Sequence, residues 1–251
     1  MLKRFIRGGT KTLKDEHGSI LVLTAALVLL LTLCFAGLSE IGRFLIVREQ
    51  TQTATDAASL AASGSGVKRW VRLTVKTYDR SRIDPCGCEE CDDDGCWCVP
   101  CCVSCPDVTR TAVGTEQDLI EQEGWRDYCE SCGSGCGESC DYTLDDRWVE
   151  YNQNTSAASA AEFYQANLPR NSTGSKIAKV TIHSDRHDPA YPSVVVYAKS
   201  KIKSLFPGFA NAFPESYETT TCSQGDTYYK KANDPHDRWI KPPEDACWKD
   251  W

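Results

Sequence analysis

The sequence predicts an α+β protein: a long N-terminal transmembrane helix extending into a small antiparallel sheet packed with a helix, plus a disulfide-rich insertion. Three observations support this fold class. One uninterrupted apolar segment lies near the N-terminus, later segments alternate apolar and polar residues as strands do, and most of the 15 cysteines lie together in the middle of the chain. A helix and a sheet that each carry one apolar face bury those faces against each other.

The apolar segment SILVLTAALVLLLTLCFAGL occupies residues 19–38 and contains no charged residue. At about 1.5 Å per residue, a helix of this length covers roughly 30 Å, which is the thickness of the hydrocarbon core of a bilayer. We therefore predict a transmembrane helix at residues 19–39.

The flank before this helix is basic. Lys and Arg are retained on the cytoplasmic side of a membrane. We therefore predict a cytoplasmic basic N-terminus at residues 1–18 and a single N-in span of the cytoplasmic (inner) membrane, with the C-terminal domain in the periplasm or extracellular space. The basic residues are Lys3, Arg4, Arg7, Lys11 and Lys14, opposed by Asp15 and Glu16.

A cleaved secretory signal is the alternative interpretation of this segment. Cys34-Phe35-Ala36 resembles a small-residue cleavage site behind a short apolar region. Against it, apolar residues resume directly afterwards at 41–47, and no proline ends the helix before Pro85. The pattern favours a retained anchor.

Residues 40–66 are amphipathic, which predicts an extension of the helix outside the membrane, ended by Gly64-Ser65-Gly66. A stripe of small residues follows helical spacing along this extension. Small side chains let another backbone approach closely, either that of the same domain or that of another subunit. Ordinary helix propensity with a modest core face explains the stripe equally well. Its members are Ala54, Ala57, Ala58, Ala61 and Ala62.

Residues 67–213 are predicted to form the extracytoplasmic α+β domain. Residues 67–78 alternate as a half-buried strand, and 178–182 with 193–202 form a second alternating pair separated by a turn-rich stretch. We expect this pair to be an antiparallel hairpin. The Ala-rich segment 155–168, which Pro169 ends, predicts a helix lying across the sheet.

An insertion at residues 86–140 is dense in Cys, Gly and Asp and poor in aliphatic residues, so covalent cross-links must hold it. The tail at 214–251 is similar in kind. Up to seven disulfides are possible in an oxidising compartment, and the sequence leaves most pairings open, although Cys222 and Cys247 suit one pair. The candidates are Cys86, Cys88, Cys91, Cys96, Cys98, Cys101, Cys102, Cys105, Cys129, Cys132, Cys136, Cys140, Cys222 and Cys247.

Other chemistries fit the sequence less well. A net charge of −7 with acidic clusters argues against nucleic-acid binding. The chain has no H-E-x-x-H, G-x-S-x-G or Walker motif, so we predict no enzyme activity, catalytic residue, cofactor or small-molecule substrate. Several C-x-x-C steps make a metal-binding or thiol redox module the main alternative. The oxidising compartment and the absence of neighbouring histidines favour disulfides over a metal site.

Three motifs follow one another in the N-terminal region: Gly18, then Glu40-Ile41-Gly42-Arg43, then Asp56-Ala57-Ala58. Their order and spacing resemble the N-terminal segment of TadE/TadG-like Tad (Flp) pilus-assembly proteins. Residues 160–167 and 194–209 resemble the C-terminal half of that family. The Cys-rich insertion departs from it, and no Asp-x-Ser-x-Ser metal motif is present.

The resemblance implies a membrane-anchored structural component of pilus assembly or a related secretion apparatus, pseudopilin-like and non-enzymatic. Its expected partners are membrane lipid and other Tad/Flp pilus-assembly or pseudopilin subunits. A cleaved minor pilin subunit is a further alternative, with processing after Gly18. The fifth residue of that product is Leu23 rather than the Glu that prepilin processing usually requires, which favours a retained anchor.

Overall fold

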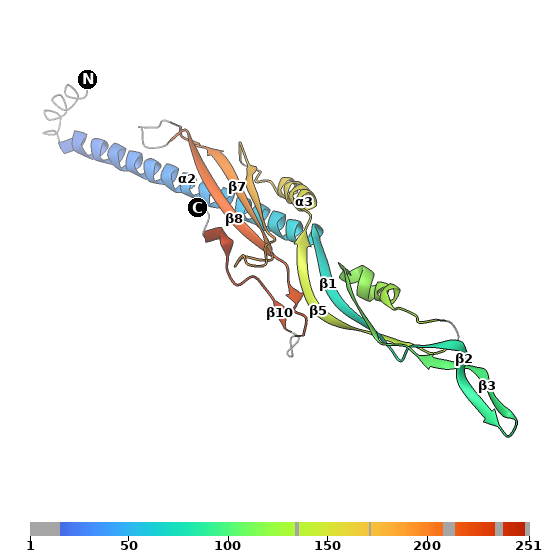
Figure 1. Ribbon diagram of the computed structural model, residues 1–251. Coiled ribbons are helices and arrows are strands. Elements are labelled where there is room, and N and C mark those ends of the chain that lie inside the picture. Colours follow the sequence, from blue (N-terminus) through green and yellow to red (C-terminus); the bar gives the residue numbers. More distant parts are fainter. Residues whose placement is uncertain (1–15, 134–135, 171, 208–213, 234–237, 249–251) are drawn as a thin grey trace.

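The fold is given by a computed structural model that describes residues 16–133, 136–170, 172–207, 214–233 and 238–248. The molecule is elongated (Figure 1), with the N-terminal half of helix α2 (Glu16–Ser65) at one end. The hairpin of β2 (Ser81–Asp92) and β3 (Gly95–Ser104) lies at the other end. Most of the predicted basic N-terminus, residues 1–15, lies outside the described residues.

Helix α2 joins the predicted membrane span and the predicted extension in one unbroken element of 50 residues, about 75 Å long. Its apolar half is exposed, from Ile20 to Leu38, and its second half lies against the domain. Among the described residues, α2 is the one helix long and apolar enough to cross a membrane. An exposed apolar helix of this length suits a single-pass membrane anchor.

A three-stranded antiparallel sheet packs on the second half of α2, with strand order β6-β7-β8. The strands are β6 (Lys176–His183), β7 (Ser193–Lys203) and β8 (Ser216–Asp226). The expected hairpin is confirmed, because β6 and β7 are paired antiparallel. Helix α3 (Gln153–Ala166) packs beside α2, close to the predicted position, and Asn152 caps its N-terminus by accepting a hydrogen bond from the Thr155 amide.

The central strand β7 is buried on both faces because α2 and α3 cover one side and the C-terminal segment covers the other. On the helix side, the core consists of Ala54, Ala58, Ala62, Ala160, Tyr164, Val194, Val196 and Ala198. On the opposite side, Val195 and Tyr197 pack with Ala190 and Ala246.

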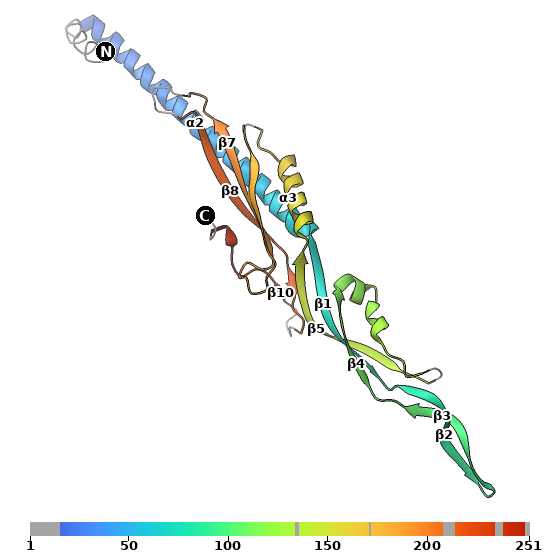
Figure 2. The same ribbon diagram turned by 45° about the horizontal axis from the view of Figure 1, so that its top comes forward.

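A second antiparallel sheet, of order β4-β1-β5, continues the molecule away from α2 (Figure 2). Its strands are β4 (Val108–Thr115), β1 (Val67–Tyr78) and β5 (Ser139–Tyr151). The alternation predicted for β1 is confirmed, since Val71, Leu73, Val75 and Thr77 are all buried. The α+β class therefore holds, but β1 and the β6–β7 hairpin lie in separate sheets.

Part of the insertion contributes to an apolar core, contrary to expectation. Ala112 of β4, Leu119 of the π-helix η1 (Gln117–Glu121) and Trp125 of the 3₁₀-helix η2 (Gly124–Tyr128) pack against β1. A few large residues, widely spaced in a polar sequence, supply this core, so composition alone did not reveal it.

The C-terminal segment, expected to be a tail of aromatic and proline residues with one pair of cysteines, also contains regular structure. It provides β8, which pairs with the whole of β7, and the short strands β9 (Tyr229–Lys230) and β10 (Trp239–Ile240). It ends in the 3₁₀-helix η4 (Ala246–Trp248). Strand β8 lacks apolar alternation because its buried face consists of hydroxyl residues and glycine.

Hydrogen bonds fix the position of the two sheets relative to each other. The Tyr191 hydroxyl pairs with both backbone groups of Val149, accepting from the amide at 2.8 Å and donating to the carbonyl at 3.1 Å. The Tyr151 hydroxyl lies 2.7 Å from Thr227 Oγ1, and burial raises the pKa of Tyr151 to about 12. These hydrogen bonds connect the sheet of β4, β1 and β5 to the segments that flank β7 and β8.

Candidate functional site

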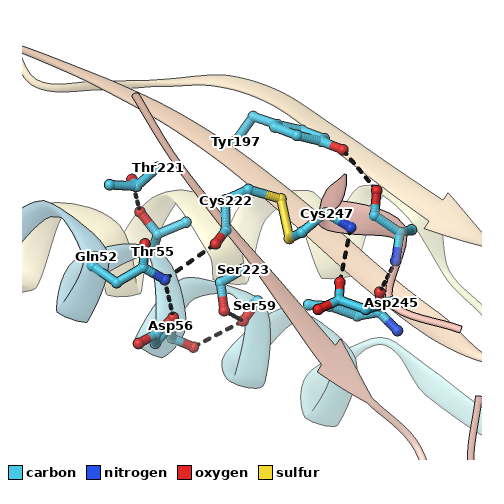
Figure 3. Close-up of a disulfide and its surroundings, with 12 residues drawn as sticks. Gln52, Thr55, Asp56, Ser59, Tyr197, Thr221, Cys222, Ser223, Asp245 and Cys247 are labelled. Carbon is cyan, nitrogen blue, oxygen red and sulfur yellow. Dashed lines mark hydrogen bonds between the residues drawn. A yellow bond between two sulfur atoms is a disulfide. The ribbon is translucent and has the colours of Figure 1, made fainter. Parts of the chain in front are cut away.

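The candidate site is the helix–sheet joint, which we define as the face of α2 from Glu40 to Ser63 together with the parts of β7 and β8 that it contacts. Hydroxyl pairs cross the joint at successive turns of the helix (Figure 3). Thr51 Oγ1 lies 2.8 Å from Ser200 Oγ, Thr55 Oγ1 lies 2.8 Å from Thr221 Oγ1, and Ser59 Oγ lies 3.0 Å from Ser223 Oγ.

Further polar contacts extend this row of hydroxyl pairs. Gln52 Nε2 donates to the carbonyl of Cys222 at 3.1 Å, and Thr227 Oγ1 donates to the carbonyl of Ser63 at 3.1 Å. Thr51, Thr55 and Ser59 are completely buried. Thr51, Thr55 and Ser59 also donate to carbonyls of the turn before them in α2, so a slip along the joint would leave the facing strand hydroxyls without partners. Buried hydroxyls on β8 that find partners on α2 therefore favour one register.

Small residues allow the helix and sheet backbones to approach closely enough for these short side chains to meet. Ala54, Ala58 and Ala62 are fully buried at the joint. At Gly225 of β8, a Cβ atom would lie 2.1 Å from the carbonyl oxygen of Ser59, so only glycine fits there. The predicted small-residue stripe therefore packs on the chain's own domain, through every fourth residue.

Glu40 closes the joint at its membrane-proximal end. Its side chain is only 3% exposed, and its Oε1 accepts hydrogen bonds from Ser204 Oγ at 2.7 Å, from the Phe206 amide at 3.1 Å and from the Leu205 amide. The carboxylate thereby satisfies backbone donors at the point where β7 ends.

Burial raises the pKa of the Glu40 carboxyl. The hydrogen bonds from Ser204 and the two backbone amides, with the positive charge of Arg43, lower it by more. The pKa therefore lies below the ordinary glutamate value of 4.5, and the side chain is ionised at neutral pH.

Disulfides hold the opposite end of the molecule. Three bonds cross the β2–β3 hairpin, and three more tie the hairpin and β5 to the segments between them. The pairs are Cys86–Cys98, Cys88–Cys101, Cys91–Cys96, Cys102–Cys136, Cys105–Cys132 and Cys129–Cys140. Cys34, in the apolar half of α2, is the free cysteine of the described residues.

The seventh disulfide, Cys222–Cys247, attaches the segment that contains η4 to β8 (Figure 3). Tyr197 and Gln224 hold the same segment through hydrogen bonds to the backbone of Ala246. The segment borders an open groove of about 950 Å³ beside α2, lined in part by Arg48, Gln52 and Lys241. No group of three His, Cys, Asp or Glu side chains suited to holding a metal ion occurs among the residues that the structure describes.

The sequence motifs of the N-terminal region lie along α2, and the joint includes several of their residues. Glu40 and Ala58 are buried in the joint, Arg43 Nη1 donates to the Lys203 carbonyl at 3.4 Å, and Asp56 accepts from Gln52 at 2.7 Å. Gly18, Gly42 and Ala57 also lie on α2.

Sequence reasoning missed the partners of these residues, namely the hydroxyl groups of the joint and Gly225. One signal was available: Thr51, Thr55, Ser59 and Ser63 recur at every fourth position, which places them on one helix face. The strand residues that face them, Thr219, Thr221 and Ser223, alternate with period two but are polar, so they do not give a hydropathy signal.

Comparison with known proteins identifies the N-terminal region. Residues 18–65 match the family model described as putative Flp pilus-assembly TadE/G-like. The resemblance predicted from the motifs is thereby confirmed for this segment, which coincides almost fully with α2. No curated protein and no solved structure matches the chain. The β-rich remainder therefore has no relative in these comparisons from which a role follows.

Proposed function

We propose that this protein is a membrane-anchored structural component of Tad (Flp) type pilus assembly or of a related secretion apparatus, pseudopilin-like and non-enzymatic. The observation that carries the proposal is the match of residues 18–65 to the TadE/G-like family model. Its partners are membrane lipid and other pilus-assembly subunits, and it takes no nucleic acid or small-molecule substrate.

The mechanism that we propose is mechanical. The helix–sheet joint fixes the angle between the membrane-spanning half of α2 and the domain, because buried hydroxyl pairs and Glu40 hold the helix at several successive turns. The two sheets then extend the chain away from the anchor (Figure 1). In this proposal, α2 spans the inner membrane N-in and holds the disulfide-bonded end at a set distance in the periplasm or outside the cell.

Pilus assembly is tested in the organism that encodes the chain. Deleting the gene should abolish the filaments sheared from the cell surface, and the full-length chain supplied in trans should restore them. The variant Gly64→Ala is a control for a tolerated substitution, because a Cβ at Gly64 meets no atom within 4 Å. It should restore filaments as well as the unsubstituted chain does. Normal filament yield in the deletion strain would refute the assignment.

A Cys-rich metal-binding or redox module is the competing function, and counting thiols separates the two. Fourteen cysteines lie in seven disulfides, so alkylation of the native unreduced chain should label Cys34 at most. Alkylated cysteines between residues 86 and 140 after chelator treatment would favour the metal site. N-terminal sequencing separates a retained anchor from a minor pilin, whose mature chain would begin at Ser19.

A further inference from the structure

We propose that the end of β7 forms a second membrane contact, in which Leu205 and Phe206 insert among the lipid headgroups beside the transmembrane helix. The proposal rests on α2 acting as the anchor and adds a lipid-binding site on the domain itself. It assigns these exposed apolar side chains to the bilayer that α2 spans.

The first observation is the exposure of an apolar pair next to a buried residue. Ser204 is buried, whereas Leu205 is 49% exposed and Phe206 is 37% exposed. Both follow β7, whose end lies beside α2 (Figure 2). Exposed apolar side chains that lie together are typical of surfaces that contact a membrane or another protein.

The second observation fixes the height of this pair relative to the membrane. The carboxylate of Glu40 binds the backbone amides of Leu205 and Phe206 directly. Glu40 is the first residue after the span at 19–39, so the bound amides lie at the level where the hydrocarbon core ends. The headgroup layer adds about 5–8 Å on each side of that core. Leu205 and Phe206 therefore lie at the depth of the headgroups.

The third observation is that α2 itself exposes apolar side chains just beyond the predicted span. Ile41 and Leu45 are 58% and 47% exposed, although they follow the predicted span. The helix rises only about 8 Å from Glu40 to Leu45, which keeps both side chains inside the headgroup layer. Exposed Lys201 and Lys203 on β7 lie at the same end, where their ammonium groups can reach lipid phosphates while the stems cover apolar surface.

The contact gives the domain two attachments to one bilayer, the helix and the end of β7. A single helix permits the domain to rock, because helices tilt by various angles in a membrane. A second point of insertion restricts that rocking, and the joint transmits the restriction along the sheets.

The test uses photo-crosslinking in the full-length chain. Benzoylphenylalanine is placed at position 206, and the protein is reconstituted in vesicles of phosphatidylethanolamine and phosphatidylglycerol and illuminated. Mass spectrometry then measures the fraction of the labelled peptide that carries a lipid adduct. Position 163 is the matched control, because Phe163 is 48% exposed on α3 on the same domain. Position 30, inside the span, is the positive control.

We expect a lipid adduct at 206 with a yield several-fold above that at 163 and approaching that at 30. An adduct at 30 with equal yields at 206 and 163 overturns the second contact and leaves the anchor intact. A crosslink from 206 to a second protein copy instead of lipid also overturns it. Absence of an adduct at 30 overturns the anchor and the second contact together.

Discussion

Near the membrane-spanning segment, α2 packs on β7 and β8 through buried hydroxyl pairs and small residues, whereas at the far end the β2–β3 hairpin has almost no buried side chain. An isolated two-stranded hairpin is marginally stable in water. The six disulfides at that end restrict the unfolded chain instead, which stabilises a structure that lacks a core.

The difference between these two ends shows how an elongated chain stays folded although it buries little apolar surface. The joint depends on the register of α2 against β8, since the strand hydroxyls need their partners on the helix. The far end depends on disulfide bonds. Reducing conditions should therefore destabilise the hairpin end much more than the joint. Substitutions that disturb packing at the joint should have the opposite pattern.

Reduction of the disulfides should produce the largest effect, mainly at the far end, where six of the seven disulfides lie. Loss of a native disulfide from a small domain costs about 2–5 kcal/mol, and several are lost at once here. We expect amide hydrogen exchange in β2 and β3 to become fast on reduction of the full chain in detergent. Amides of β7 should keep their protection, and equal loss at both ends would contradict the comparison.

Gly225→Ala should cause the next largest loss, at the joint. The added Cβ would lie 2.1 Å from the Ser59 carbonyl oxygen, so β8 must move away from α2. Overpacking of this kind costs about 1–3 kcal/mol. Urea unfolding of the full chain in detergent, followed by circular dichroism, should show a lower midpoint. Gly64→Ala on helix α2 is the control, and it should leave the urea midpoint unchanged or raise it.

Thr55→Val should test whether the hydroxyl pairs themselves matter. The substitution keeps the shape but leaves the Thr221 hydroxyl buried without its partner, at a cost of about 1–3 kcal/mol. Adding Thr221→Val should recover part of that loss, because no polar group then remains unpaired. The same urea midpoints measure it, and Thr53→Val is the control at an exposed site. Strictly additive losses would argue against a coupled pair.

Glu40→Gln should have the smallest and most local effect, visible mainly as a change in pH dependence. The folded-state pKa of Glu40 is lowered, so ionisation stabilises the fold above the ordinary value of 4.5, and this contribution is lost as the pH falls through the lowered pKa. Exchange protection of the Leu205 and Phe206 amides should fall over that acidic range in the unsubstituted chain.

The glutamine variant should show weaker protection at neutral pH and should lose that acidic transition, because no carboxylate remains to titrate. Glu49→Gln, at an exposed position on the same helix, is the matched control and should retain the transition. If Glu40→Gln shows an acidic transition of the same size, the transition belongs to another titratable group.

Much of the fold followed from periodicity. The long apolar helix, strand β1, helix α3 and the β6–β7 hairpin all lie where the sequence predicts them, because each has a regular apolar face. Strand β8 escaped prediction because its buried face is polar and is satisfied only by hydroxyl groups of α2, which are more than 160 residues away in the chain.

The sequence by itself determined which elements form and that an apolar helix anchors them, because hydropathy and helical or strand periodicity are local properties of the chain. Only the tertiary structure decided how the cysteines of the insertion pair, that β1 and the β6–β7 hairpin lie in separate sheets, and that Glu40 binds the end of β7. Those choices depend on groups far apart in sequence meeting within hydrogen-bonding or bonding distance, and a local pattern does not encode that distance.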